Sequence, residues 1–177
     1  MISIEFVLDA SPFGIGGLLI ENGVCTEFFS DALKAEDYHR FEHQPGDAAG
    51  QQTWESLAAM VAIRLWRSKW TSERIRITVR GDSIAMLSLV LNMRPKSTQM
   101  RLIGQEIALD LAEVSFLPLI AEHIPGVANV AADKLSRTFN LEAKDLPVLH
   151  AATKRHPSAR TDFYFKSLAC PHPVKRD

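Results

Sequence analysis

The first thirty residues constrain the fold most, because apolar and polar side chains alternate there with the two-residue period of a β-strand. The stretch SPFGIGG then turns the chain. Asn22-Gly23 separates the apolar runs GLLIENG and VCTEFFSDA, which is a strong β-hairpin signal. Three successive antiparallel strands are therefore expected before residue 33. The apolar positions of the first strand are Ile2, Ile4, Phe6 and Leu8.

Helical and strand patterns alternate beyond a loop over residues 32–50, in which a short helical turn is expected. The segment QQTWESLAAMVAIRLWRSKW repeats apolar residues at helical spacing, with Thr53 as the expected N-cap. Pro118 favours an edge position or a bulge for the last strand. The order β-β-β-α-β-α-α-β-α predicts an α/β fold with a five-stranded mixed sheet flanked by helices. The later strands are expected over 74–82 and 114–124, and the later helices near 83–93, 98–112 and 127–137.

The composition changes after residue 138, where clear periodicity gives way to prolines, histidines and scattered basic residues. We therefore expect one domain over residues 1–138 and a C-terminal tail or linker over residues 139–177. The chain has 177 residues, of which 46% are apolar, and this is enough for one compact hydrophobic core.

Charge, cysteine content and hydropathy narrow the function classes. The formal net charge is -1, so the total charge gives no support for nucleic-acid binding. The 2 cysteines form no metal-type pair and fit a reducing compartment. No apolar run approaches the ~18 residues of a membrane-spanning helix. We expect an intracellular protein of the cytoplasm or the nucleus that does not engage a membrane.

Four carboxylates lie where regular structure does not require them, at strand ends and in helices: Asp9, Glu55, Asp82 and Asp133. Each has an ordinary alternative, since acids favour helix N-termini, start turns or lie on solvated faces. Carboxylates that converge repel each other unless a cation compensates them. Hard oxygen ligands without cysteine or histidine clusters indicate Mg²⁺ or Mn²⁺ rather than zinc. Two such ions side by side form a phosphoryl-transfer site.

The segments VLDASPFGIGGLL, QQTWESLA, VRGDS and EHIPGVANVAADKLSR follow one another over about residues 3–138. Together they resemble the ribonuclease H domain of LTR-type retroelement reverse-transcriptase polyproteins. The resemblance implies a ribonuclease H-like catalytic domain that hydrolyses the RNA strand of RNA-DNA hybrids by a two-metal-ion mechanism. The products would carry 5′-phosphate and 3′-hydroxyl ends. The family recognises the hybrid through backbone shape and RNA 2′-hydroxyls, not through base sequence.

The resemblance also assigns roles to individual residues. The metal-binding and catalytic tetrad, which would hold two Mg²⁺ ions or Mn²⁺ in their place, corresponds to Asp9, Glu55, Asp82 and Asp133. A further catalytic candidate is His123, because it matches a mobile histidine of the family that assists proton transfer or product release. Asn129 has the alternative role of holding its turn and capping the last helix. The expected substrate contacts are Ser11, Gln51, Gln52, Ser83 and Asn129.

The chain departs from the family between its middle helices, where a basic protrusion is missing and only Arg94, Lys96 and Arg101 are basic. The isolated domain, expected to be a monomer, would then bind hybrid weakly and depend on the polymerase portion of the same polyprotein. Two alternatives remain open. One is a catalytically inactive ribonuclease H-like structural or nucleic-acid-binding module, and the other is a transposase- or resolvase-type DNA nuclease. The GIGG stretch leads into a strand, which argues against a dinucleotide-binding loop.

Overall fold

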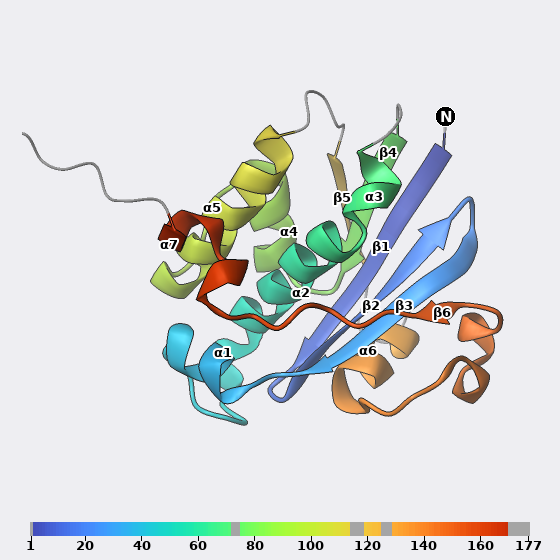
Figure 1. Cartoon of the computed structure of the whole chain (residues 1–177), viewed down its shortest axis with the longest axis horizontal. Helices are drawn as coiled ribbons and strands as arrows, with labels where there is room; N and C mark the ends of the chain where they lie inside the picture. The colour runs from blue at the N-terminus through green and yellow to red at the C-terminus, as the bar shows by residue number, and fades with distance from the viewer. Residues whose placement is uncertain (1, 72–74, 114–118, 125–128, 170–177) are drawn as a thin grey trace, which may run out of the picture.

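A six-stranded mixed sheet forms the centre of the molecule (Figure 1). The structure is a computed structural model and describes residues 2–71, 75–113, 119–124 and 129–169. The strand order is β5-β4-β1-β2-β3-β6, with β1, β2 and β3 antiparallel and β4 and β5 parallel to β1. The expected mixed sheet is confirmed, although it has six strands and not five. The strands are β1 (Ile2–Ser11), β2 (Gly14–Glu21), β3 (Val24–Ala32), β4 (Ile75–Gly81), β5 (Leu119–His123) and β6 (Thr153–Lys154).

The first hairpin is tighter than the sequence pattern predicts. The turn expected over SPFGIGG is confined to the residues between Ser11 and Gly14, which already pair with each other. The Ser11 hydroxyl closes this turn by accepting hydrogen bonds from the backbone N–H groups of Phe13 (3.2 Å) and Gly14 (3.1 Å). Gly16 lies within β2, where it pairs with Asp9. It is a glycine because a Cβ there would lie 2.6 Å from the Cβ of Leu135. The glycines of this stretch therefore serve close packing across the sheet.

The helices alternate with the later strands in the expected order. Ser83 and Ser97 begin two of them as side-chain N-caps, each accepting a hydrogen bond at 3.2 Å from the backbone N–H three residues later. The helices of the described residues are α1 (Ala35–Arg40), α2 (Gln51–Leu65), α3 (Arg67–Trp70), α4 (Ile84–Asn92), α5 (Thr98–Ala112), α6 (Val130–Arg137) and α7 (Lys166–Ala169). Short 3-10 turns are η1 (Ala48–Gly50), η3 (Ala143–Asp145), η4 (Pro147–Leu149) and η5 (Asp162–Tyr164).

Two details of the long helical segment were wrong in the prediction. Thr53 is not the N-cap, because η1 already brings the chain into a helical conformation and α2 starts at Gln51 after Gly50. Thr53 is instead buried inside α2. The helix also does not run unbroken to residue 70. It ends at Trp66, whose buried ring packs on Phe6 with ring centroids 5.1 Å apart.

Helices cover both faces of the sheet and enclose two cores (Figure 1). The larger core lies between the sheet and the helices α2, α4 and α5, with the fully buried Trp54 and Trp66 among its largest side chains. The smaller core lies on the other face, where α6 packs on β1, β2 and β3. Alternation along β3 sends Phe29 into the first core and Phe28 into the second. The ends of β1, β4 and α2 are thereby held in fixed positions.

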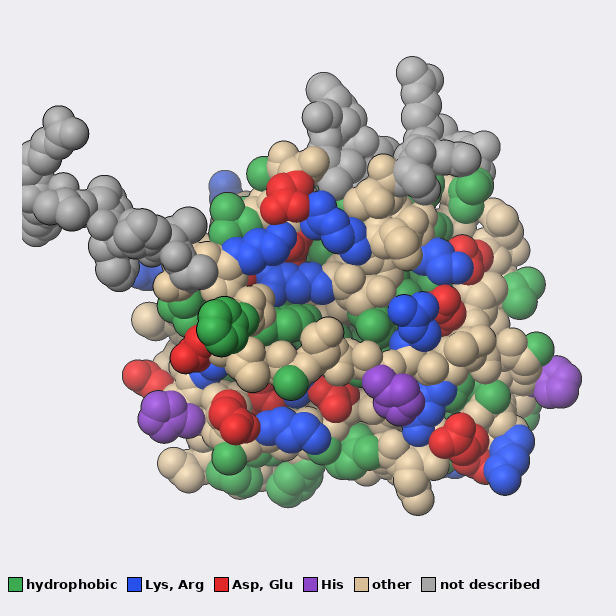
Figure 2. All heavy atoms as spheres, in the orientation of Figure 1, with side chains coloured by type: hydrophobic (Ala, Val, Ile, Leu, Met, Phe, Trp, Pro, Cys, Tyr) green, Lys and Arg blue, Asp and Glu red, His purple; other side chains and the backbone are tan. Residues whose placement is uncertain are grey.

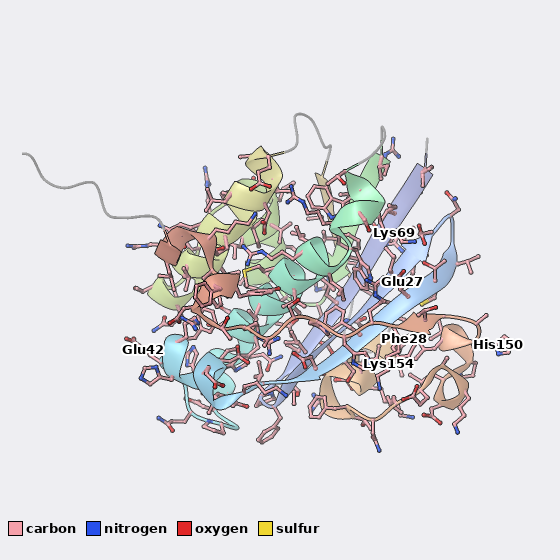
Figure 3. The ribbon with its side chains drawn as sticks, viewed as in Figure 1. Glu27, Phe28, Glu42, Lys69, His150 and Lys154 are labelled. Atoms are coloured by element: carbon pink, nitrogen blue, oxygen red, sulfur yellow. The ribbon has the colours of Figure 1, made fainter. Side chains whose placement is uncertain are left out.

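The segment 139–169, predicted to be part of a tail or linker, packs against the sheet and the helices. β6 pairs with the outer strand β3, and Figure 3 labels Phe28 and Lys154, which are partners in this ladder. Leu149 completes the smaller core and Phe165 the larger one, and both are fully buried. This part of the chain is therefore a structural component of the sheet and of both cores.

Buried ion pairs hold the same segment in place. Arg160, with a side chain only 3% exposed, donates hydrogen bonds to both carboxylate oxygens of Asp37 at 2.8 Å and to Asp31 at 2.6 Å. Further along, Arg64 of α2 bonds Glu106 and Asp110 of α5 and the backbone carbonyl of Tyr164. The acids of α5 are buried under the C-terminal segment and are not on a solvated face.

Some expectations fall on residues outside the described ranges. These are Pro118, the Pro125-Gly126 turn, the start of the helix expected from Val127, and residues 170–177. β5 does lie at the edge of the sheet, as Pro118 predicted for this strand. Among the helices that the structure describes, none has the length and apolar content needed to cross a membrane.

Candidate active site

Three of the four predicted acids meet beyond the C-terminal ends of the central strands β1 and β4. Asp9 lies two residues before the end of β1, and Asp82 directly follows β4, the parallel neighbour of β1. Glu55 reaches them from α2, which packs across β1. One ligand oxygen from each of the three carboxylates lies within 4.8 Å of the other two. Adjacent parallel strands bring their carboxyl ends together, and sites of α/β sheets form there.

Burial and mutual repulsion make this cluster electrostatically costly. Burial raises the pKa of Glu55 to about 9, with the charges of Asp9 and Asp82 adding to the rise. Burial also raises the pKa of Asp9 to about 6, again with a contribution from Asp82. Asp9 is 5% exposed and Glu55 2%, whereas Asp82 is open to solvent. The site is therefore open to solvent at Asp82, and the negative charge is least favourable on the buried Glu55.

A hard divalent cation fits this donor set. The Oε2 atom of Glu55 is buried and has no hydrogen-bond partner among the described residues. A buried carboxylate oxygen is normally satisfied, and either a proton shared with the neighbouring Asp9 carboxylate or a bound cation would satisfy this acid. Oxygen donors alone, with no sulfur or imidazole in the cluster, match Mg²⁺ or Mn²⁺. The expected metal site is therefore chemically consistent for Asp9, Glu55 and Asp82.

Asp133, the expected fourth ligand, lies near the cluster but outside it. Its carboxylate accepts a hydrogen bond from Arg137 Nε at 2.8 Å, one helical turn away on α6. Its charge still contributes to the raised pKa of Asp9. The hydrogen bond and charge of Asp133, together with the charge of Asp9, raise the pKa of Arg137. Arg137 thus places a positive charge beside the carboxylates, and only the i,i+4 spacing to Asp133 indicated this in the sequence.

Gln51 and Gln52, expected to contact substrate, have different environments. The Gln51 amide donates to Glu55 Oε1 at 2.8 Å and to the backbone carbonyl of Ala10 at 2.6 Å. It therefore orients the buried acid and ties the start of α2 to the end of β1. Gln52 lies on the exposed side of α2. The positioning role of Gln51 was missed in the sequence, although its i,i+4 spacing to Glu55 was visible.

The expected contacts Ser11, Ser83 and Asn129 all have structural partners. The buried hydroxyl of Ser11 donates to the carbonyl of Ser136 at 2.7 Å and closes the β1–β2 turn. Ser83 caps α4. Asn129 stands at the N-cap position of α6, but its side chain does not cap the helix and donates instead to the carbonyl of Leu8 at 2.9 Å. Ser11 and Asn129 thereby connect β1, which carries Asp9, to the segment of α6, which carries Asp133.

His123 is the last residue of β5 and is exposed. It pairs in register with Gly81, the residue before Asp82. His123 and Asp82 therefore lie at the neighbouring C-terminal ends of β5 and β4.

The fold is shared with ribonucleases H. LC11-RNase H1, isolated from compost by a metagenomic approach, superposes with a TM-score of 0.56 at 20% identity, covering 76% of this chain and 91% of its own. The complex of LC11-RNase H1 with an RNA/DNA hybrid gives 0.57 at 18% identity, with coverages of 76% and 93%. RNase H1 from the halophilic archaeon Halobacterium salinarum gives 0.54 at 15% identity, with coverages of 76% and 92%. At these identities the likeness concerns the fold.

The sequence matches no family model and no curated protein.

Proposed function

We propose that this protein is a metal-dependent endoribonuclease that hydrolyses the RNA strand of RNA-DNA hybrids. The observation that carries the proposal is the cluster of Asp9, Glu55 and Asp82, whose ligand oxygens lie within 4.8 Å of one another. The cluster stands in a fold shared with ribonucleases H, one of them solved in complex with an RNA/DNA hybrid. The motifs that resemble retroelement ribonuclease H domains support the same substrate.

Asp9, Glu55 and Asp82 would hold the metal, with Asp133 as the fourth acid. Two Mg²⁺ ions, or Mn²⁺ in their place, would activate water and neutralise the charge that develops on the phosphodiester. Gln51 fixes Glu55 in position through its 2.8 Å hydrogen bond. Arg137 holds Asp133 and compensates part of the local negative charge.

Two exposed residues, His123 and Gln52, would act on the substrate directly. His123, exposed beside the strand end that carries Asp82, would take or give a proton at the leaving or entering oxygen. Gln52 is exposed at the start of α2, and its amide would donate to the sugar edge of the hybrid. Ser11, Ser83 and Asn129 support these groups through the backbone.

We further propose that the domain is the ribonuclease H portion of an LTR-type reverse transcriptase, whose polymerase portion would help to hold the hybrid. Residues 1–138 carry all the proposed site residues, and residues 139–169 support them by completing the sheet and both cores. The scarcity of basic residues between α4 and α5 agrees with a need for a second hybrid-binding surface.

A cleavage assay on three substrates tests the substrate class. End-labelled RNA-DNA hybrid, double-stranded DNA and a four-way DNA junction are each incubated with the protein, with and without Mg²⁺. The proposal predicts that only the RNA strand of the hybrid is cut, and only with metal. Cutting of either DNA substrate would instead identify a transposase- or resolvase-type nuclease. Absence of cutting on all three would identify an inactive module.

A further inference from the structure

Phe13 is a large apolar side chain on the surface close to the carboxylate cluster. It lies in the turn between β1 and β2 and is 56% exposed. Phe13 is four positions after Asp9 in the sequence, so the two Cα atoms are at most about 14 Å apart. A nucleic-acid strand advances about 3.4 Å per nucleotide. Phe13 is therefore within about four nucleotides of a phosphodiester held at the carboxylates.

The backbone around Phe13 is fixed by hydrogen bonds from three sides. Its N–H donates to the Ser11 hydroxyl at 3.2 Å, and its carbonyl accepts from Leu33 N at 2.9 Å. The preceding carbonyl, of Pro12, accepts from the Tyr38 hydroxyl at 2.8 Å. The exposed ring is thus presented by a rigid turn. A rigid apolar contact loses little conformational entropy when a ligand covers it.

The ring of Phe13 is supported on one side by the loop that leads into α2. A Cβ added to Gly46 would come within 3.1 Å of the Phe13 ring, and Gly46 has a φ of +79°, which favours glycine. The same loop continues through η1 to Gln51, whose side chain bonds Glu55 and Ala10. The loop that supports the Phe13 ring therefore leads directly to Gln51, the residue that positions Glu55.

We propose that Phe13 is a substrate-contact residue that packs on the sugar-phosphate backbone of the hybrid, within about four nucleotides of the cleaved phosphodiester. This inference rests on the proposed function and adds a contact that needs no charge. Sugar C–H groups and base faces are apolar and pack on aromatic rings. On the face shown in Figure 2, Lys and Arg side chains lie among Asp and Glu side chains. The chain carries a formal net charge of -1, so an aromatic contact would add affinity that the total charge does not supply.

Steady-state cleavage of the hybrid by Phe13→Ala tests the inference. We expect KM to rise about 5- to 150-fold, which corresponds to the roughly 1–3 kcal/mol of one aromatic stacking contact, with kcat changed less than about twofold. Phe13→Trp, which keeps an aromatic ring, should retain the wild-type KM. The matched control is Phe163→Ala, because Phe163 is 95% exposed and lies in the C-terminal segment. This control should cleave like the wild type.

An unchanged KM for Phe13→Ala, or an equal rise for Phe163→Ala, would overturn the inference while the proposed function stands. Thermal melting of each variant checks folding. If Phe13→Ala does not fold, Phe13→Leu carries the test, because it keeps an apolar side chain over Gly46 but loses the flat ring. Phe13→Leu should then show a raised KM, and a wild-type KM would overturn the inference. Absence of hybrid cleavage by the wild-type protein would overturn the proposed function as well.

Discussion

Glu55 is deeply buried and has two carboxylates close by, so its ionised form is unfavourable for two reasons. An isolated buried carboxylate is destabilising unless it is protonated, paired or bound to a cation. Gln51 satisfies one oxygen of Glu55, and the second has no partner among the residues that the structure describes. A hydrophobic residue would fill this position at lower cost. The acid is therefore best explained by a bound cation.

The unfavourable ionisation of Glu55 predicts how the stability of the metal-free protein depends on pH. The folded-state pKa values of Asp9 and Glu55, about 6 and about 9, lie above the unfolded values near 4. Protonated acids contribute stability that is complete below about pH 4 and is lost as the pH rises toward 9. In EDTA, the free energy of unfolding should therefore fall between pH 6 and 9, by at least ~1 kcal/mol.

Urea unfolding across this pH range measures the effect, and Glu55→Gln is the informative variant. The neutral amide cannot ionise, so the variant should show a much flatter dependence than the wild type. A wild-type slope that survives in Glu55→Gln would show that Glu55 does not carry the unfavourable charge. Mg²⁺ should stabilise the wild type more at pH 9 than at pH 6, because metal and protons compete for the same oxygens.

At the scale of elements, the packing of the C-terminal segment depends on buried charges. Arg160→Ala would leave Asp37, whose side chain is 1% exposed, buried without its partner. Removal of one member of a buried ion pair costs about 3–5 kcal/mol, and urea unfolding should show a loss of that order. Arg155→Ala is the matched control. Arg155 is 43% exposed and pairs with Glu27 of β3, so its loss should cost ~1 kcal/mol or less.

Equal destabilisation by Arg160→Ala and Arg155→Ala would contradict a special role for the buried pair. Asp37→Asn should also destabilise, because Arg160 would then retain only Asp31 as an ionised partner. The proposed site residues lie on other elements, so these variants should cleave hybrid at wild-type rates wherever they remain folded.

The regular elements could be predicted from the sequence because each has a local signal. The strands β1 and β3 alternate in hydrophobicity, and α5 was predicted with the bounds it has. The predictions failed where tertiary contacts decide. An apparently continuous helix is interrupted at Trp66, whose backbone leaves the helical conformation while its ring packs into the core. Gly16 reads as part of a turn but lies in a strand, where it admits the close approach of Leu135.

The candidate site was predictable in its residue types and less so in its contacts. Asp9, Glu55 and Asp82 were expected to converge, and they do. The pairing of Asp133 with Arg137 was not foreseen, although their i,i+4 spacing on a helix allows it. The contact of Gln51 with Glu55 was missed in the same way, and both glutamines were expected to contact substrate.

At the scale of the whole molecule, the segment 139–169 is packed as part of the fold. β6 pairs with β3, and Leu149 and Phe165 are buried in the two cores. This packing could not be predicted, because it rests on isolated residues such as Leu149 and Phe165 that repeat with no period. The acids Glu106 and Asp110 resemble a solvated helix face until Arg64 and Lys166 cover them.

The whole molecule therefore holds a solvent-open acid, Asp82, on a frame that does not depend on it for stability. Asp82→Asn removes a charge from the cluster and leaves the packing of both cores unchanged. The matched control is Asp162→Asn, because the side chain of Asp162 is 85% exposed and lies in the C-terminal segment. Melting temperatures should confirm that both variants fold.

The most direct test is the rate of RNA-strand cleavage in an RNA-DNA hybrid by Asp82→Asn in saturating Mg²⁺. We expect this rate to fall by at least about 100-fold relative to the wild type, the usual scale for loss of a group that stabilises developing charge. Asp162→Asn should cleave at the wild-type rate. A folded Asp82→Asn protein that cleaves the hybrid as fast as the wild type would contradict a nuclease centre at these carboxylates.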